Sequence, residues 1–454
     1  MATTYTRPSD WLTMPTVATS SQTFVGLFAV CNHDSNYVAV KATTNTGSYQ
    51  VNWGDGTVTT HASNTQAEYL YTYSAISDST ICSRGYKQVL ITVTPVTGNI
   101  LTFITSVTHS ALGAGAKKVT WLDWIINFPY LSSGASLAFQ GVIKHGWLEK
   151  VTISHIGGLT DMGLLFSGMY GLKQVNITAT TTGVTSCYIM FANCFSLISV
   201  SLFNTSNVLN AQQMFWTCTA LEEIPNFNFS KVTTATSMFQ NSRIKTVPAL
   251  DMRLNIDFSS MFNGCGMLTE IGLMDVRSGT NFNNFANGCV RLKTVANLNM
   301  SAATTATSAF ASCYSLDNFP AMTVGNTNCN LTSFLSSAGS LKTVGDMDVS
   351  KAVNFTTFLT GTPALRIYPA LNLNAGTTLT SMVGAMATKV PFINVRASHS
   401  LANRNLGKPA IVEVFNGLAS GVSAKTITVS ANPGYTSLTS ADRLIATAKG
   451  WTIA

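Results

Sequence analysis

A unit of about 24 residues recurs along most of the chain and restricts its fold more than any other feature. One clear copy, residues 204–225, contains the pair Met214-Phe215. The positions equivalent to Phe215 follow one another at steps of 23 to 25 residues, and they are Phe166, Phe191, Phe239, Phe262, Phe285, Phe310, Leu335, Leu359 and Val383. Such a period predicts a solenoid, because one unit cannot bury its apolar stripe alone and must stack on its neighbours.

Two further features complete the unit. An apolar-x-x-apolar anchor, such as Leu221/Ile224, follows the Met-Phe pair, and a short alternating strand such as Leu250-x-Met252 comes next. Alternation directs one set of side chains inward and the intervening set outward. We therefore expect about ten coils with an internal column at the Phe position.

The outward positions of these strands are expected to form a row of weakly charged polar side chains. They are Thr152, Asn176, Ser201, Asn228, Asp251, Asn299, Thr323, Asp348 and Asn372. Two interpretations are open: a ladder that only solvates the sheet, or a face that binds a glycan or a protein, as the sheets of solenoids commonly do.

The repeat resembles the leucine-rich repeats of the BspA-like surface-protein family over roughly residues 140–390. The residues that carry the resemblance are Thr205-Ser206-Asn207-Val208 with Met214-Phe215, Phe229-Ser230-Lys231-Val232 with Met238-Phe239, and the Cys-x-x-Leu steps Cys194/Leu197, Cys218/Leu221, Cys265/Leu268 and Cys313/Leu316. After Phe310 the sequence departs from the pattern, since Leu or Val fills the column. The resemblance implies a binding scaffold and names no ligand.

Residues 1–111 lack the repeat and predict short strands at 23–31, 37–42, 48–53 and 88–95. The turn Trp53-Gly54-Asp55-Gly56-Thr57, followed by the Tyr-x-Tyr strand of residues 69–73, resembles the polycystic-kidney-disease-type domain. That resemblance implies a small immunoglobulin-like sandwich, in which we expect Asp55 to bond its own turn.

The segment that precedes this sandwich, residues 7–11, resembles the opening of tailed-phage virion proteins that join such a sandwich to these repeats. An extended arm with an exposed Trp11, together with Arg7, would anchor the chain to a neighbouring subunit. The alternative is that Trp11 packs on its own domain.

The remaining segments complete a mainly β organisation with three parts: the arm and sandwich at 1–111, the solenoid with its N-terminal cap at 112–400, and a small α/β capping module at 401–454. Residues 118–126 are too apolar to lie exposed and predict the cap and a first imperfect coil. The last module is expected to contain helices at 409–418 and 437–448 and strands at 425–429 and 451–453.

Composition and the N-terminal sequence limit the class of protein and its expected cellular location. Only 10% of residues are charged while 46% are hydrophobic, which excludes a disordered chain. Five of nine cysteines occupy one turn position of the repeat, where they are expected to act as small buried hydrophobes rather than disulfides or metal ligands. No apolar run approaches the about 20 residues of a membrane span, and the N-terminus has no signal peptide, so we expect a protein made in the host cytoplasm without membrane insertion.

Charge and motifs add little chemistry. The net charge is +7, and seven basic residues gather at 389–454, either as a solvated cap or as a contact with an acidic surface. Basic runs with interleaved aromatics are absent, so no nucleic-acid partner is expected. Hydrolase, P-loop and metalloprotease motifs are also absent, and we expect no enzyme, no catalytic residue, no cofactor and no metal site.

The leading hypothesis is a structural or adhesive protein on the surface of a tailed-phage virion, as a head decoration, a fibre or a tail-associated protein. Its sandwich or arm would attach to capsid or tail proteins, and the solenoid would project toward a host surface glycan or protein, with the chain oligomeric in the assembly. The alternatives are a bacterial cell-surface adhesin and a polysaccharide depolymerase, which needs acidic residues clustered on one face.

Overall fold

The computed structural model describes residues 4–33, 36–105, 107, 109–111, 119–131, 139 and 145–454. The chain divides into two compact units, unit 1 (residues 1–229) and unit 2 (residues 230–454). As expected, the protein is mainly β, with 26% strand and 6% helix, and contains a β-solenoid. Its turns number about 13 in the described part of the chain, more than the ten expected. The division into three parts at 111 and 400 stays a prediction.

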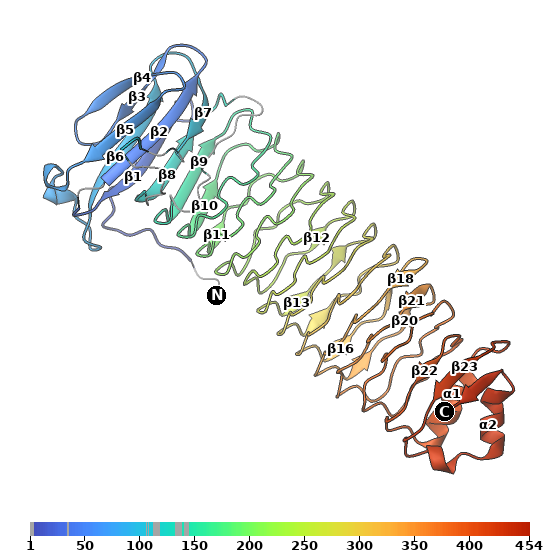
Figure 1. Cartoon of the computed structure of the whole chain (residues 1–454). Helices are drawn as coiled ribbons and strands as arrows, with labels where there is room; N and C mark the ends of the chain where they lie inside the picture. Colours follow the sequence, from blue (N-terminus) through green and yellow to red (C-terminus); the bar gives the residue numbers. More distant parts are fainter. Residues whose placement is uncertain are drawn as a thin grey trace. The chain divides into compact units, whose positions relative to one another are not determined.

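Unit 1 is built on one sheet in which the N-terminal strands continue into the solenoid (Figure 1). Strand β8 joins the two, because it pairs antiparallel with β1 on one side and parallel with β9 on the other. The strands lie in the order β11 (Ser199–Val200), β10 (Gln174–Ile177), β9 (Lys150–His155), β8 (Trp121–Asn127), β1 (Thr23–Val30), β6 (Lys87–Pro95), β3 (Ser48–Asn52) and β4 (Val58–Ala62).

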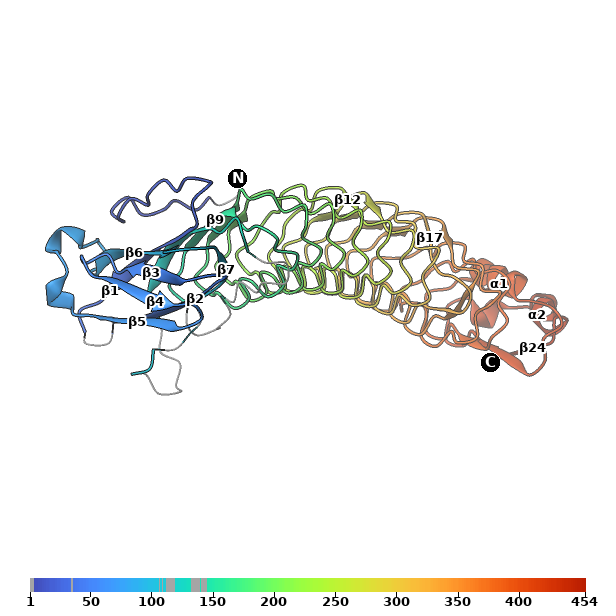
Figure 2. The ribbon, with the colours of Figure 1, turned by 90° about the horizontal axis from the view of Figure 1, so that it is seen from above.

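A second sheet packs against the N-terminal part of the first and completes a two-layer sandwich, as Figure 2 shows. Its order is β5 (Gln66–Tyr71), β2 (Asn36–Thr44) and β7 (Ile100–Ile104). Aromatic rings fill the space between the layers: the ring centroids of Phe24 and Phe103 lie 4.7 Å apart, and those of Phe28 and Tyr71 lie 5.7 Å apart. The sandwich core is therefore continuous from β1 to both outer strands of the second sheet.

The Trp53–Thr57 turn is structural, as the sequence predicts. Asp55 Oδ1 accepts the Thr57 backbone N–H at 2.9 Å, and Oδ2 accepts the Tyr69 hydroxyl at 2.7 Å. Gly54 and Gly56 adopt positive φ values of 84° and 94°, a conformation that favours glycine. The Asp55 carboxylate is fully used in holding the turn.

Strand β8 confirms that the apolar stretch expected to begin the solenoid is buried. Trp121, Trp124 and Ile126 have no exposed surface. The rest of the expected cap, residues 112–118 and 132–138, lies outside the described residues. Both edges of β8 are paired, with β1 and with β9, so β8 itself presents no open edge.

The predicted internal column exists in both units. In unit 1, Phe191 stacks on Phe166 and on Phe215, each at 5.4 Å and within 11° of parallel. In unit 2, Phe239 and Phe262 stack at 5.5 Å and 2°. Each coil also bonds its neighbour through the backbone, as where Phe191 N–H donates to Met214 O at 2.9 Å.

The expected register is wrong at one position, Phe285. Phe262 N–H donates to Phe285 O, and Ala286 N–H donates to Ala309 O, so Ala286 rather than Phe285 is the equivalent of Phe262 and Phe310. The true steps are 24 residues. Phe285 occupies the Met position, and its ring turns edge-on (79°) to reach Phe262 at 5.4 Å, which restores the aromatic contact that Ala286 lacks.

The five repeat cysteines form a second column. Each thiol lies against a carbonyl oxygen of the preceding coil: Cys194 Sγ is 3.1 Å from Phe166 O, and Cys218 Sγ is 3.1 Å from Phe191 O. Burial raises the pKa of Cys194 to about 12. These thiols therefore stay protonated and serve as buried donors.

Two left-handed residues bracket the Met-Phe turn in nearly every coil. The residue that stands two positions before the Phe column has a φ between 50° and 61° in each coil. These residues are Leu164, Ile189, Gln213, Ser237, Ser260, Asn284, Ser308, Ser333, Thr357 and Ser381. A non-glycine residue rarely adopts this conformation, so the ladder of inter-coil hydrogen bonds must offset the strain. The return segment is accordingly a stack of turns and not a strand.

Most coils of unit 2 contain one or two very short parallel strands. They are β12 (Leu250–Asp251), β13 (Glu270–Ile271), β14 (Met274–Asp275), β15 (Thr294–Val295), β16 (Asn318–Phe319), β17 (Met322–Thr323), β18 (Cys329–Asn330), β19 (Thr343–Val344), β20 (Met347–Asp348) and β21 (Ala352–Asn354). The neighbours pair in parallel at one-coil spacing, as β12 with β14 and β17 with β20.

The C-terminal elements follow the sequence prediction within two or three residues. They are β22 (His399–Ser400), α1 (Lys408–Gly417), β23 (Lys425–Thr428), α2 (Ser440–Thr447) and β24 (Trp451–Ile453), and the three strands form one parallel sheet. Thr439 and Asp442 form a capping box at the start of α2. Among the described residues, neither helix is long and apolar enough to cross a lipid bilayer.

The buried His399 of β22 is expected to make the stability of unit 2 sensitive to acid. Burial lowers the pKa of His399 to about 4, helped by the nearby Arg404 cation, while the Leu379 carbonyl that faces Nδ1 at 2.9 Å opposes the shift. An unfolded His binds protons near pH 6.5, so stability falls as pH drops from 6.5 to 4, by about 3 kcal/mol. Urea unfolding across this range measures the loss.

A profile for the wild type that is flat between pH 6.5 and 4 would contradict the prediction.

Candidate binding groove

Two hollows lie side by side on the outward surface of unit 2 and form what we call the groove. Their volumes are about 870 and 530 Å³, and they share Asn297 and Asn299. The lining residues of the larger hollow are Asn297, Asn299, Ser301, Ala321, Met322, Thr323, Asp346, Met347, Asp348 and Ala370; the smaller adds Ala249, Leu250, Asp251, Leu273, Met274, Asp275, Val276 and Arg277.

Strand alternation positions the polar side chains of the groove. Leu250, Met274, Met322 and Met347 point into the core and are at least 93% buried. The next residue of each strand points outward, and backbone pairing aligns Asp251 with Asp275 and Thr323 with Asp348. Asn299 occupies the same position in the coil between them, so one column of five polar groups runs along the groove at roughly 4.8 Å per coil.

Local turns hold most of these side chains in place. The Oδ1 atom accepts the backbone N–H two residues later at Asp251 (3.3 Å), Asp275 (3.4 Å), Asn299 (3.1 Å) and Asp348 (3.1 Å). An Asp or Asn does this because its short side chain reaches its own turn. The column is therefore partly structural, because these turns fix the direction of each side chain.

Two of the four aspartates that line the groove are paired with arginines. Arg253 Nε donates to Asp251 Oδ1 at 2.9 Å, and Arg277 Nε donates to Asp275 Oδ1 at 2.8 Å. These arginines lower the pKa of both carboxyls, and the Ser350 hydroxyl lowers the pKa of Asp348. All three aspartates are consequently charged at neutral pH.

Four of the nine residues predicted to form the binding face line the groove: Asp251, Asn299, Thr323 and Asp348. Asn372 lies in the same column but outside the lining, where its Oδ1 accepts the Asn394 amide at 3.2 Å. The prediction missed Asp275, Asn297 and Asp346. Asp275 stands 24 residues after Asp251, so the period alone could have found it.

The other four predicted residues belong to unit 1, and three of them are not equivalent to Asp251. Thr152 lies on β9 and pairs with Asn176. Asn204 Oδ1 accepts the Ser206 N–H at 2.9 Å, as Asp251 does from Arg253, and Asn228 follows one coil later. Asn176 lies instead on β10, and Ser201 directly after β11, where its hydroxyl accepts the Ile177 N–H at 2.7 Å. The predicted row thus mixed two columns. Asn176 and Ser201 directly follow the second apolar anchor of their coils, whereas Asn228 and Asp251 stand four residues after it.

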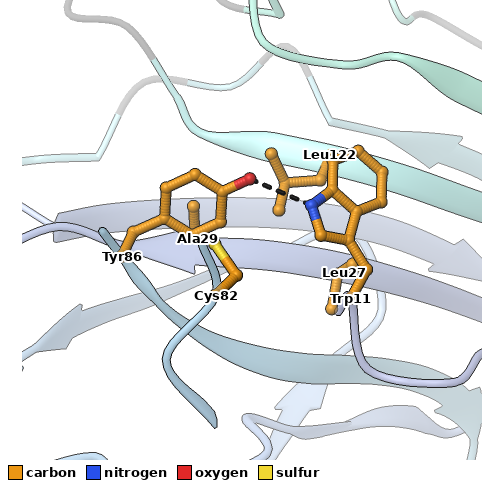
Figure 3. Packing of buried hydrophobic residues seen from close by; sticks show 6 residues of the cluster. All are labelled: Trp11, Leu27, Ala29, Cys82, Tyr86 and Leu122. Atoms are coloured by element: carbon orange, nitrogen blue, oxygen red, sulfur yellow. Dashed lines mark hydrogen bonds between the residues drawn. The ribbon is translucent and has the colours of Figure 1, made fainter. Parts of the chain in front are cut away.

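The two residues predicted to anchor the chain lie within their own domain. Trp11 is 3% exposed and packs on Leu27, Ala29, Cys82, Tyr86 and Leu122, as Figure 3 shows. Its Nε1 donates to the Tyr86 hydroxyl at 3.1 Å, and Arg7 Nε donates to Asp123 Oδ2 at 2.7 Å. The exposed Trp11 that the anchoring hypothesis assumed is therefore absent, and anchoring by these residues stays a prediction.

Residues 137–252 match the family model described as a Mycoplasma protein of unknown function, DUF285. This match and the solenoid fit a BspA-like repeat protein. The match covers the coils that carry the most regular Met-Phe pairs. No curated protein matches the chain.

Proposed function

We propose that this BspA-like repeat protein is a non-enzymatic binding protein whose groove holds an extended, hydroxyl-rich glycan. The observation that carries the proposal is the column Asp251, Asp275, Asn299, Thr323 and Asp348, which repeats polar groups at one-coil spacing along a hollow surface. A linear glycan presents donors and acceptors along its length, so a periodic row of fixed oxygens and amides suits it.

The protonation of the groove argues for binding rather than hydrolysis. A glycosidase needs one carboxylic acid with a raised pKa beside a carboxylate. Here the pKa values of Asp251, Asp275 and Asp348 are all lowered, and the carboxylates of Asp251 and Asp275 are paired with arginines. Sugar release from host envelope polysaccharide would overturn the non-enzymatic assignment.

We further propose that the protein acts on the surface of a tailed-phage virion, attached to capsid or tail proteins, with a polycystic-kidney-disease-type sandwich. The support is the sequence resemblance of residues 7–11 and of the sandwich turn, together with the β8 junction, which ties the sandwich to the solenoid. Antibody labelling of purified particles tests this location. Label on bacterial cells instead of particles would favour a cell-surface adhesin.

Changing the groove without breaking its turns should weaken glycan binding at least tenfold. Asn299→Asp and Asp348→Asn keep the Oδ1 atom that accepts the turn N–H but change the charge and the second polar atom of a lining side chain. A tenfold loss corresponds to about 1.4 kcal/mol. Calorimetry with fractionated envelope polysaccharide measures it.

The matched control is Thr294→Ala, an exposed change on β15 away from the lining residues. Equal affinity in all variants, or binding of host protein but not polysaccharide, would contradict the glycan assignment.

A further inference from the structure

A separate hollow in unit 1 combines an exposed aromatic ring with two cations. Its volume is about 340 Å³, and it lies beside β8 and the starts of β9 and β10. The lining residues are Arg84, Tyr86, Leu122, Gly146, Trp147, Glu149, Gly171, Lys173 and Ser196. We call this the aromatic–cation hollow, and it shares no residue with the groove of unit 2.

Trp147 supplies an aromatic wall that is open to solvent. Trp147 is 38% exposed. Behind it stands Tyr86, 4% exposed, with ring centroids 5.9 Å apart at 53°. The Tyr86 hydroxyl accepts the Trp11 indole N–H, so the wall rests on a fixed support.

Arg84 and Lys173 supply the positive charge. Arg84 Nη1 donates to Glu149 Oε1 at 2.6 Å, and Lys173 Nζ donates to Glu149 Oε2 at 3.0 Å. Glu149 is 7% exposed and also accepts the Tyr5 hydroxyl at 3.1 Å. Two cations thus share one carboxylate, which leaves a net positive charge at the hollow.

Both cations retain donors for a ligand. An arginine has five N–H donors and a lysine three, and their side chains are 42% and 32% exposed. Glu149 holds the guanidinium of Arg84 and the ammonium of Lys173 in place, so a ligand carboxylate meets both groups already positioned. A planar guanidinium beside an ammonium favours a carboxylate over a neutral group.

We propose that the aromatic–cation hollow binds a carboxylated sugar, a uronic or sialic acid, of an acidic glycan. The sugar carboxylate pairs with Arg84 and Lys173, and the apolar face of its ring stacks on Trp147. The Ser196 hydroxyl, which also lines the hollow, can bond a ring hydroxyl. The hollow therefore selects for acidic sugars, independently of the groove.

The test titrates the full chain with glucuronic acid, N-acetylneuraminic acid, glucose and acetate, by calorimetry and by tryptophan fluorescence. We expect both acidic sugars to bind with a Kd of about 1 mM, and glucose and acetate at least tenfold more weakly. Added NaCl should weaken binding, because the contact is charged.

Variants separate the two halves of the hollow. Lys173→Gln and Trp147→Ala should each lower the affinity at least tenfold, Trp147→Phe should restore most of it, and the surface change Lys293→Gln should have no effect. The groove variants Asn299→Asp and Asp348→Asn should also leave it unchanged, so failure here is distinguishable from failure of the groove. Urea unfolding confirms that each variant is folded.

Three outcomes would overturn the proposal. One is glucose binding as tightly as glucuronic acid. Another is acetate or an acidic peptide binding as tightly as the sugars, which would remove the role of the ring. The third is affinity that Lys173→Gln and Trp147→Ala leave intact.

Discussion

Phe191→Ala should lower the free energy of unfolding by about 3–5 kcal/mol. Phe191 has no exposed surface, and its ring is stacked on both sides, at 5.4 Å from Phe166 and 5.4 Å from Phe215. Removing it leaves a cavity between two rings that the inter-coil hydrogen bonds hold apart. Because repeats depend on their nearest neighbours, the loss should concentrate in adjacent coils.

Urea unfolding measures the total effect, and hydrogen exchange of unit 1 amides locates it. The matched control is Phe195→Ala, four residues later, whose ring is 41% exposed and should cost below about 1 kcal/mol. Equal effects of the two substitutions would show that the column does not stabilise the solenoid.

Arg7→Ala should destabilise unit 1 by roughly 3 kcal/mol at neutral pH. It removes the partner of Asp123, which is 1% exposed on β8 between the sandwich and the solenoid. Burial raises the pKa of Asp123, and the hydrogen bond from Arg7 opposes that rise. Between the ordinary pKa of Asp and the raised pKa of Asp123, the folded state therefore binds more protons than the unfolded state. Stability falls as pH rises through this window.

Without Arg7 the pKa of Asp123 should rise further, so the loss of folding stability with rising pH should be larger. The variant should therefore recover part of its stability on acidification toward pH 5. Arg7→Ala combined with Asp123→Asn tests the cause, since a neutral amide of the same shape removes the buried charge. The double variant should be more stable than Arg7→Ala alone at pH 7. A single variant within 1 kcal/mol of wild type would show that the arm contributes little.

The sequence alone determined the solenoid and most of its column. Phe166, Phe191, Phe215, Phe239 and Phe262 recur at one period, and a side chain that recurs once per coil must meet its copies in the core. The same holds for the capping box of Thr439 and Asp442, which depends on residues three positions apart. Both are set by short-range spacing, which a sequence shows directly.

Tertiary structure decided which residues meet when spacing was ambiguous. Phe285 and Ala286 could each align with Phe262, and only the inter-coil hydrogen bonds assign Ala286 to the column. Asp251 and Asp275 stand four residues after the second apolar anchor of their coils and pair in one column, which Asn176 and Ser201, directly after that anchor, do not share.

Contacts between distant segments were beyond the sequence altogether. Trp11 meets Tyr86, and Arg7 meets Asp123, across 75 and 116 residues without any periodic signal. The aromatic–cation hollow likewise joins Arg84 to Glu149 across 65 residues. Such pairs depend on how the sandwich folds back on the first coils, because only that packing brings the buried carboxylates and their cations together.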